Sequence, residues 1–472
     1  MIPEEFINKR VSFDFCKMKL VFALSQSLFS SYDVDTGTRL LLKTLKQTVD
    51  FSRVRRVLDL GCGTGVIGIV LGKCFPHLKV TAQDRDALAV AFSEYNAREN
   101  GLSPSTFRAI GGIAYEGIAA GIAEETTLVK ANEYPEGGKE SIEIARGVFD
   151  LIVSNLPAKA GYPVLEEMIS RAVYHLTDHG ILATVVVNNL AERIEGFLSN
   201  NFLILNKKTG KKHTVFVSKM NKVCQISETK RTPGLGRYIR EHVRFNFHGK
   251  GYELSTAFGL GNFDSMDYIT ELVIKILELS ESLFRESHGM HYSGSFSGTS
   301  TSGTSTNRSS VNRGKRLLVW NPGQGYIPIC STVQRYLSRK DEKTNGIILA
   351  GRDRLALLVS KTNLVKNNIL KPEEIAMLHL PFLSSSIEEI AGFHDNNCFQ
   401  TAVFLLEEAS YYSSESFANY LRGILKNKDF ILAGRSTIIA RLLKNKSTLK
   451  GLKVFYDKKY HGFRGILGWF DY

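Results

Sequence analysis

The stretch Val57–Val70, VLDLGCGTGVIGIV, decides the fold of this chain. The apolar run Arg55–Leu60 predicts a buried strand, and the helical pattern from Val66 onward predicts a helix. Between them lies a turn with three glycines, Gly61, Gly63 and Gly65. Glycine lacks a Cβ atom and permits positive φ, so a ligand can lie directly against the backbone here. The stretch predicts a strand, a turn and a helix that hold a nucleotide-like ligand.

The acid before this turn indicates which ligand it holds. The glycine spacing is GxGxG, and Asp59 stands two residues before the first glycine. A dinucleotide enzyme places a pyrophosphate at the helix N-terminus. S-adenosylmethionine (SAM) has no phosphate, but it carries an ammonium group that a carboxylate can hold. Asp59 therefore favours SAM over NAD, and we assign Cys62 of the turn to the same cofactor-binding set.

A second acid follows the next predicted strand, Lys79–Gln83. Asp84 stands nineteen residues after Gly65, near the spacing at which such folds hold ribose hydroxyls. A carboxylate accepts two hydroxyl hydrogen bonds well, although a solvated acid at a strand end is the alternative. We predict that Asp84 and its neighbour Arg85 bind the cofactor, with Asp86 as the alternative acid.

A third predicted strand, Phe149–Val153, leads into Ser154-Asn155-Leu156-Pro157-Ala158-Lys159. Ligands in this architecture bind at the carboxyl ends of the strands, where Asn155 is expected to lie. Its carbonyl can accept a hydrogen bond from an exocyclic amine and orient the nitrogen lone pair toward a methyl donor. The alternative is an Asn that only forms a turn before Pro157.

The two halves of the chain repeat one pattern. Val57–Val70 aligns with Leu317–Cys330, LLVWNPGQGYIPIC, and Asp84–Ala89 aligns with Gly351–Ala356. Further correspondences pair Asn96 with Asn363, Asn100 with Asn367, and Gly180–Val185 with Phe430–Arg435. Each half also alternates apolar runs with helical patterns. We predict an α/β protein with two tandem, doubly wound sheets of Rossmann type; two unrelated α/β domains are the alternative.

These motifs carry a resemblance to a known family. VLDLGCGTGVIG, QDRDALAVAFSEYNARENGL, FDLIVSNLPAKAG and the preceding DVDTGTRLLLKTL resemble the small-domain class I SAM-dependent methyltransferases over about residues 20–220. Among these, the chain is similar to bacterial ribosomal RNA guanine-N2 methyltransferases, which contain two related domains. The resemblance implies SAM as cofactor, Asn155 and Pro157 as catalytic residues, and methylation of an exocyclic nitrogen.

The chain departs from the family motif Asn-Pro-Pro-Phe/Tyr at two positions. Leu156 replaces the first proline, and Ala158 replaces the aromatic residue that stacks on the target base in the family. The substituting aromatic stays open among three candidates, Phe29, Tyr32 and Tyr162. The acid that contacts adenine in the family is not identifiable between Ile110 and Gly147.

The second copy has lost the polar residues of the first. Val319 stands where the first copy has Asp59, Asn321 where it has Gly61, and Gly351 where it has Asp84. The segment from Val403, VFLLEEASYY, has no Asn-Pro. We therefore predict a degenerate second domain that keeps the fold and lacks SAM binding. In the similar ribosomal RNA enzymes the degenerate copy comes first.

Composition changes divide the chain. We expect a catalytic domain over residues 1–225, a basic linker over 226–250 and a degenerate domain over 251–472. Within the last, a Ser/Gly/Thr-rich tract at about 290–314 predicts a flexible insert, because it cannot form a packed core.

The charge of the chain indicates a polyanionic partner. Its formal net charge is +13, and Lys and Arg gain affinity by displacing the counterions of phosphates. We predict that RNA contacts a basic group at an expected hairpin turn, although a solvated charged face is the alternative. This group comprises Lys207, Lys208, Lys211 and Lys212, and we assign Lys159, which follows the Asn-Pro motif, to the same RNA-binding set.

Other features narrow the class of protein. No apolar stretch approaches twenty residues, and the first ten residues lack a signal peptide's apolar core, so we expect a cytoplasmic protein with no membrane contact. The six cysteines are scattered without CxxC pairs, so no metal site is expected. The oligomeric state is not predictable.

The leading hypothesis is a SAM-dependent methyltransferase acting on guanine N2 of ribosomal RNA. Two alternatives stay open. One is an N-methyltransferase of a glutamine amide or a small molecule, and the other is a non-catalytic factor that binds RNA.

Overall fold

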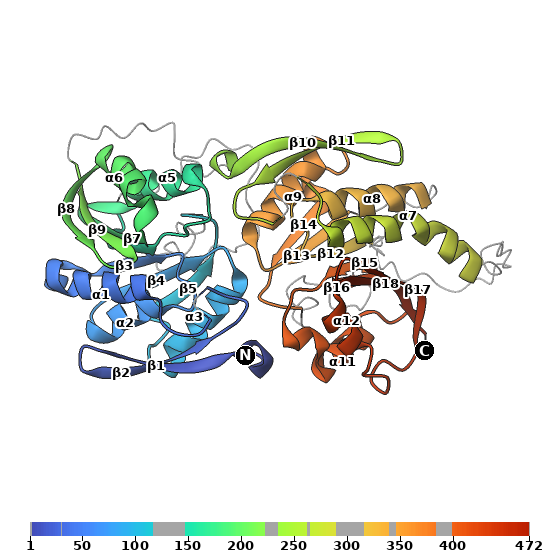
Figure 1. The fold of residues 1–472 in the computed structure, drawn as a ribbon, viewed down its shortest axis with the longest axis horizontal. Coiled ribbons are helices and arrows are strands. Elements are labelled where there is room, and N and C mark those ends of the chain that lie inside the picture. The colour runs from blue at the N-terminus through green and yellow to red at the C-terminus, as the bar shows by residue number, and fades with distance from the viewer. Residues whose placement is uncertain are drawn as a thin grey trace, which may run out of the picture.

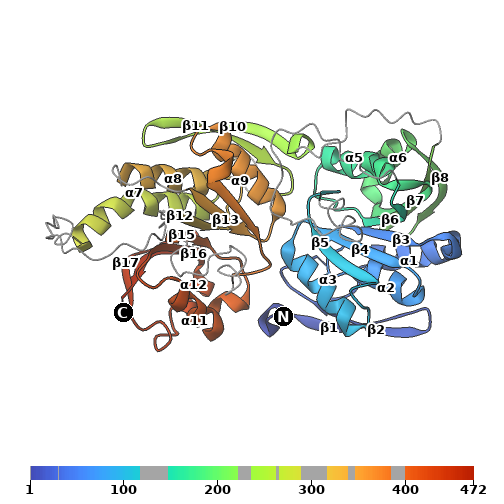
Figure 2. The ribbon, with the colours of Figure 1, turned by 180° about the vertical axis from the view of Figure 1, so that it is seen from behind.

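The computed structural model describes residues 2–29, 31–116, 147–221, 235–261, 265–288, 316–338, 346–383 and 399–471. The tract at 290–314 and residues 226–234 of the expected linker lie outside this range. Two α/β units lie side by side, the first coloured blue to green and the second yellow-green to red (Figures 1 and 2).

The elements of the first unit are β1 (Lys9–Phe15), β2 (Met18–Leu24), α1 (Thr36–Thr48), β3 (Arg56–Leu60), α2 (Val66–Cys74), β4 (Lys79–Asp84), α3 (Ala87–Glu99), β5 (Phe107–Gly111), β6 (Phe149–Asn155), α5 (Tyr162–Ser170), β7 (Leu176–Val187), α6 (Ala191–Ser199), β8 (Phe202–Thr209) and β9 (His213–Met220). The predicted strands before the glycine turn, Asp84 and Asn155 are therefore confirmed as β3, β4 and β6.

The elements of the second unit are β10 (Ile239–Phe247), β11 (Lys250–Ala257), α7 (Tyr268–His288), β12 (Arg316–Trp320), α8 (Tyr326–Ser338), β13 (Ile347–Gly351), α9 (Arg354–Lys366), β14 (Ile375–His379), β15 (Phe399–Leu405), α11 (Glu415–Ile424), β16 (Asp429–Arg435), α12 (Ser436–Leu442), β17 (Leu452–Tyr460) and β18 (Phe463–Phe470). Short 3-10 helices span Glu4–Phe6, Phe51–Arg53, Arg171–Tyr174, Asn188–Leu190, Leu235–Arg237, Pro372–Glu374 and Ser410–Ser413.

The two main sheets have the same topology. Their strand orders are β5-β4-β3-β6-β7-β9-β8 and β14-β13-β12-β15-β16-β18-β17. In each sheet the first five strands run parallel, and the last two form an antiparallel hairpin. This common order confirms the predicted pair of doubly wound sheets.

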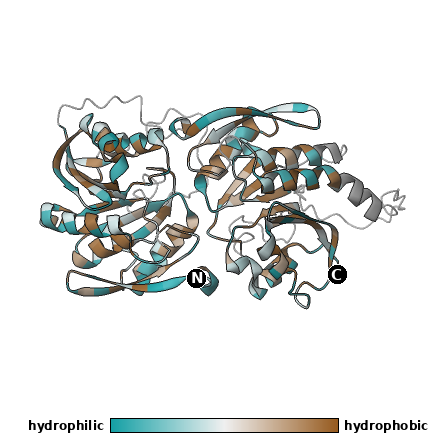
Figure 3. Ribbon diagram, viewed as in Figure 1, coloured by the Kyte–Doolittle hydropathy of each residue, from teal (hydrophilic) through white to brown (hydrophobic). Residues whose placement is uncertain are grey.

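Helices cover both faces of each sheet, so the strands are buried on both sides. In the first unit, α1, α2 and α3 contribute to the core on one face, and α5 and α6 to the core on the other. In the second unit, α7, α8 and α9 lie on one face, and α11 and α12 on the other. Figure 3 shows the resulting apolar strands, which a parallel sheet between two helix layers requires.

Each unit also carries a separate β-hairpin held by two asparagines. Asn96 exchanges two hydrogen bonds with the backbone of Ala23 in β2, and Asn100 does the same with Val21. In the second unit Asn363 exchanges two hydrogen bonds with the backbone of Ser255 in β11, and Asn367 does the same with Glu253. The asparagines matched in the sequence are thus the residues that fasten the hairpins.

The hairpin β10–β11 runs across the expected domain boundary at residue 250. Because it is fastened to α9 as β1–β2 is fastened to α3, we propose that the second unit begins with this hairpin.

No helix among the described residues is long and apolar enough to cross a membrane.

Candidate active site

The glycine turn between β3 and α2 has the backbone that only glycine adopts freely. Gly61, Gly63 and Gly65 have φ angles of 75°, 55° and 83°. A Cβ atom on Gly61 or Gly63 would meet nothing within 4 Å, whereas one on Gly65 would lie 2.9 Å from Ile69 and 3.0 Å from Ser93. The first two glycines face open space, and the third allows close packing of α2 on α3.

Asp84 lies at the end of β4 against this turn. Its Oδ2 accepts a hydrogen bond from the Gly63 amide at 3.0 Å, and its Oδ1 accepts one from the Asp86 amide at 2.9 Å. Each oxygen has a further lone pair, so a pair of ligand hydroxyls can still bind. Burial raises the pKa of Asp84 to about 6, and the nearby Asp86 carboxylate contributes. The carboxylate therefore ionises near neutral pH.

Asp59 lies beneath the turn rather than on its open side. Its side chain is fully buried, and its Oδ2 accepts a hydrogen bond of 2.8 Å from the Gly68 amide in the first turn of α2. The Oδ1 is buried with no hydrogen-bond partner among the described residues. Burial raises the pKa of Asp59 to about 7. The carboxylate anchors the start of α2, and its charge lies under the ligand-facing backbone.

Cys62 also points away from the open side. Its side chain is buried, and its Sγ lies 3.2 Å from the Ser93 hydroxyl of α3. Burial raises the pKa of this thiol well above its ordinary value. Only the backbone of Cys62 is available to a ligand at the turn.

Asn155 is held by the first turn of α1. Its amide nitrogen donates to Asp35 Oδ2 at 3.0 Å and to the Thr38 hydroxyl at 3.2 Å. Asp35 is also the N-cap of α1, because its Oδ2 accepts from the Thr38 amide. A carboxylate only accepts hydrogen bonds, so the NH2 group of Asn155 must face Asp35. The Asn155 carbonyl oxygen is thereby fixed on the other side, with no hydrogen-bond donor found for it among the described residues.

Asp35 and Thr38 were not among the predicted site residues. Their signal in the sequence is DVDTGTRLLL, an acid followed three residues later by Thr38 at the start of an apolar helical pattern. That pattern predicts a helix start, but it does not indicate a contact with a residue far along the chain.

The two departures from the Asn-Pro motif have different environments. Leu156 is buried in the core shared with α5, so this substitution serves packing. Pro157, Ala158 and Lys159 are exposed in a turn closed by the Ala160 amide, which donates to the Pro157 carbonyl at 2.9 Å. The position of the missing aromatic therefore faces outward.

The three candidate aromatics are all exposed, at 72% for Phe29, 66% for Tyr32 and 49% for Tyr162. The Arg193 guanidinium lies 4.9 Å from the ring centre of Tyr162 and covers it. Phe29 and Tyr32 belong to the loop between β2 and α1, which leads to Asp35. These two rings remain the freer candidates to stack on an acceptor.

Arg85 and the predicted RNA-binding lysines lie in different parts of the structure. Arg85 turns away from the glycine turn and donates to the Gly259 carbonyl of the second unit at 2.6 Å. Lys207 pairs with Glu195 at 2.6 Å, while Lys208 donates to Gln47 of α1 at 3.2 Å. Lys211 and Lys212 are exposed in the turn of the β8–β9 hairpin.

This basic turn adjoins the Asn155 side of the site. His213, which follows it, has its Nδ1 at 3.3 Å from the Thr36 hydroxyl at the start of α1. The β8–β9 hairpin and the acceptor side therefore share the same end of α1.

In the matching region of the second unit, a polar residue stands in place of a glycine and a glycine stands in place of an acid. Asn321 keeps the positive φ of the glycine that it replaces, at 55°, and its amide donates to the Leu405 carbonyl. Gly351 stands where the first unit has Asp84, and a Cβ there would be 3.0 Å from Asn321 Oδ1. A cavity of about 460 Å³ remains at this edge, but the Asn321 side chain occupies the space in which a side chain at residue 351 would begin.

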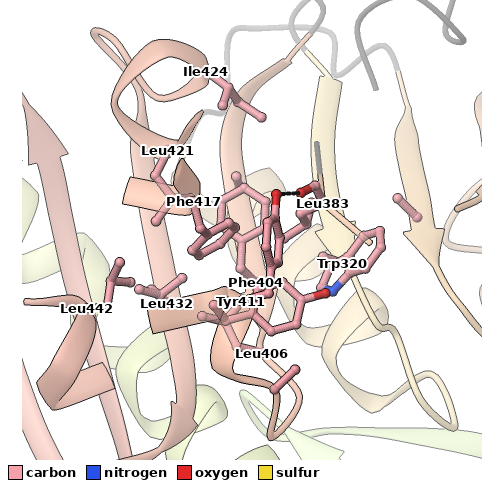
Figure 4. Close-up of a cluster of buried hydrophobic side chains, with 14 of the residues drawn as sticks. Trp320, Leu383, Phe404, Leu406, Tyr411, Phe417, Leu421, Ile424, Leu432 and Leu442 are labelled. Carbon is pink, nitrogen blue, oxygen red and sulfur yellow. Dashed lines mark hydrogen bonds between the residues drawn. The ribbon is translucent and has the colours of Figure 1, made fainter. Parts of the chain in front are cut away.

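The interior beneath this degenerate region is filled by aromatic side chains. Trp320, Phe404 and Phe417 are fully buried in one cluster (Figure 4), and Trp320 stands where the first unit has Leu60. Tyr412 belongs to the same cluster. Among the described residues, no group of three His, Cys, Asp or Glu side chains could hold a metal ion.

Comparison with known proteins supports the predicted resemblance. Residues 19–121 match the model of a family described as "Methyltransferase small domain". The "Ribosomal RNA small subunit methyltransferase C" of Pasteurella multocida is 34% identical over 162 residues, which cover 34% of this chain and 39% of the relative. The protein of the same name from Mannheimia succiniciproducens is 33% identical over 170 residues, covering 35% and 40%. The match thus spans about two fifths of the length of these relatives.

A solved structure shares the fold over the whole chain. It is the "T. Thermophilus 16S rRNA N2 G1207 methyltransferase (RsmC) in complex with AdoMet and Guanosine". It is 14% identical, covers 100% of both chains and has a TM-score of 0.58. The fold of this chain is therefore shared with a protein of known structure.

Proposed function

We propose that this chain is a SAM-dependent methyltransferase that acts on an exocyclic nitrogen of a base in RNA, guanine N2 of ribosomal RNA. The observation that carries the proposal is Asn155, whose amide is oriented by Asp35 and Thr38 so that its carbonyl oxygen is left to accept a hydrogen bond. The relatives that match about a third of the chain carry the name of a ribosomal RNA methyltransferase.

The glycine turn and Asp84 fit the cofactor. The open space above Gly61 and Gly63 admits a ligand against the backbone, and both oxygens of Asp84 retain accepting capacity for ribose hydroxyls. SAM, when bound, supplies an electrophilic methyl group on its sulfonium. In its ionised form Asp59 supports this site, because a negative charge under the turn favours the ammonium group of the ligand.

Asn155 and its turn position the acceptor. An exocyclic amine that donates one N–H to the Asn155 carbonyl has its lone pair directed along the remaining axis, toward the methyl group. The new N–C bond forms as the S–C bond breaks, and the nitrogen then loses a proton to water. Catalysis is mainly positioning, with Pro157 and Lys159 on the exposed turn beside the acceptor.

The acceptor class rests on the basic hairpin and on the names of the relatives. Lys211 and Lys212 lie near the start of α1, and Lys208 contacts Gln47 near the end of the same helix. These lysines can contact the phosphates of an RNA whose base reaches Asn155. Such an acceptor implies a protein of the cytoplasm, and the chain requires no metal for this reaction.

Two variants test the proposal. Calorimetric titration with SAM should give one site per chain, and the D84A variant should bind SAM at least tenfold more weakly, because two charge-assisted hydrogen bonds are removed at about 1.5–3 kcal/mol each. The N155A variant should bind SAM as the parent does and transfer no methyl group to unmodified ribosomal RNA. Transfer by N155A, or no SAM binding by the parent chain, would overturn the proposal. Transfer only to a protein amide would reject RNA as acceptor.

A further inference from the structure

Two arginines matched by the internal repeat cross between the units in opposite directions. Arg352 of the second unit places its guanidinium on both oxygens of Asp86 in the first, with Nε 3.1 Å from Oδ1. In return, Arg85 of the first unit pairs with Asp353 of the second at 3.3 Å. Asp86 and Asp353 are the N-caps of α3 and α9. The arginine of each unit therefore binds the N-cap residue of a helix in the other unit.

The backbone contacts follow the same symmetry. The Ala87 amide donates to the Arg352 carbonyl at 2.9 Å, and the Arg354 amide donates to the Arg85 carbonyl at 2.9 Å. Asp86 and Asp353 form an antiparallel β-bridge between these bonds. The two units therefore pair as the copies of a two-fold symmetric dimer do.

A third pair of contacts completes the symmetry. Arg352 Nη2 donates to the Ser27 carbonyl at 3.1 Å, and Arg85 Nη2 donates to the Gly259 carbonyl at 2.6 Å. These carbonyls are equivalent, because each lies four residues after the hairpin residue gripped by Asn96 or Asn363.

The contact made by Arg352 is buried and closely packed. Its side chain is 11% exposed and that of Asp86 is 26% exposed. His379 of β14 lies with its Nε2 2.7 Å from the Arg352 carbonyl and 2.8 Å from the Arg85 carbonyl. A Cβ on Gly111 would be 2.5 Å from the His379 ring, so only glycine permits this approach. His379 thus contacts the backbone on both sides of the junction, while the Arg352 guanidinium itself is held by Asp86 and the Ser27 carbonyl.

The two contacts differ in the residues that lie next to them in each unit. On the first unit, the Asp86 amide donates to Asp84 Oδ1, so the residue that Arg352 holds also holds the carboxylate at the glycine turn. Ser27 lies in the loop between β2 and α1, which leads to Asp35, and Asp35 fixes Asn155. On the second unit, Arg85 holds Asp353, but glycine stands in place of the acid at residue 351. Arg352 therefore contacts the unit that has the candidate cofactor site, and Arg85 contacts the unit that has lost the corresponding acid.

We propose that Arg352 of the second unit is a positioning residue for the cofactor site of the first. It fixes the loop between β4 and α3 and the loop between β2 and α1 relative to each other, and so sets the position of Asp84. The inference rests on the proposed function, because it concerns SAM binding at that site. Its consequence is that the degenerate unit sets the affinity of the first unit for SAM.

The test uses the full-length chain with three substitutions. R352M keeps the length of the side chain but removes the guanidinium, and R352K keeps the charge without the two-pronged contact. R464M is the matched control, because Arg464 pairs with Asp457 on the β17–β18 hairpin of the same unit. SAM dissociation constants come from calorimetry, KM and kcat from methyl transfer to RNA, and integrity of the fold from thermal unfolding.

We expect R352M to raise both the dissociation constant and the KM for SAM about tenfold, with kcat at saturating SAM within about twofold of the parent. R352K should give an intermediate affinity, and R464M should bind SAM as the parent does. A loss of structure alone would lower the active fraction instead of raising KM.

The outcomes separate this inference from the proposed function. If the parent chain fails to bind SAM, the proposed function fails. If the parent binds SAM and a folded R352M binds it equally well, only the role of Arg352 is wrong. If R352M does not fold, R352K decides, and an affinity equal to that of the parent would overturn the inference.

Discussion

Replacing Asp59 with Asn measures the energetic cost of the carboxylate beneath the glycine turn. Burial raises the pKa of Asp59 from 3.8 to about 7. The native state therefore holds this proton more tightly than the unfolded chain does. Between about pH 4 and pH 7 the unfolded chain loses the proton while the native state keeps it, so the free energy of unfolding falls as the pH rises. Above pH 7 both states are ionised, and the cost stays constant.

The size of this effect follows from the two pKa values. For 3.8 and about 7, linkage gives a loss of about 2.6 kcal/mol in the free energy of unfolding between pH 5 and pH 8. The side chain in the D59N variant does not titrate, and its carbonyl oxygen can still accept from the Gly68 amide. The variant should escape this loss, which corresponds to roughly 5–10 °C in thermal midpoint for a domain of this size.

Scanning calorimetry of the two proteins at pH 5 and pH 8, without SAM, gives the result. We expect the midpoint of D59N relative to the parent to rise by roughly 5–10 °C from pH 5 to pH 8. D178N, which changes an exposed carboxylate of the same unit, is the control. A D59N difference that is equal at both pH values would refute the argument that burial keeps this carboxyl protonated.

Two further predictions concern the second unit and the RNA surface. W320A should lower the free energy of unfolding by about 3–5 kcal/mol, because it empties a fully buried site, while calorimetry should find SAM affinity unchanged if the aromatic cluster serves only the fold. A triple variant of Lys208, Lys211 and Lys212 to Ala should weaken RNA binding and flatten its dependence on log salt, by about 0.7 for each phosphate that the protein no longer neutralises. K207A is the control, since Lys207 is paired with Glu195, and an equal effect of K207A would contradict this assignment.

The fold was predictable because it depends on short-range patterns. The glycine turn requires positive φ at residues close in sequence, and the apolar runs match strands buried on both faces. The repeat revealed the second sheet, since a duplicated pattern of apolar residues and asparagines preserves the core and the hairpin contacts even where ligand residues have been replaced.

Only some of the predicted site residues face the open side of the glycine turn or the acceptor. Asp84 and Asn155 lie where the sequence suggested, at the carboxyl ends of β4 and β6. Asp59 and Cys62 lie beneath the turn, and Arg85 faces the other unit. Spacing along a strand fixes which residues follow its end, but it does not fix the direction in which each side chain points.

The sequence by itself determined the two sheets, the open glycine turn and the loss of polar residues from the second copy, because each depends on the type and local spacing of residues. Only the tertiary structure decided which groups support the site. Asn155 is oriented by Asp35 and Thr38, more than a hundred residues earlier, and the Asp84 loop is held by Arg352 of the other unit. Such contacts arise from the packing of distant elements, and no local pattern records them.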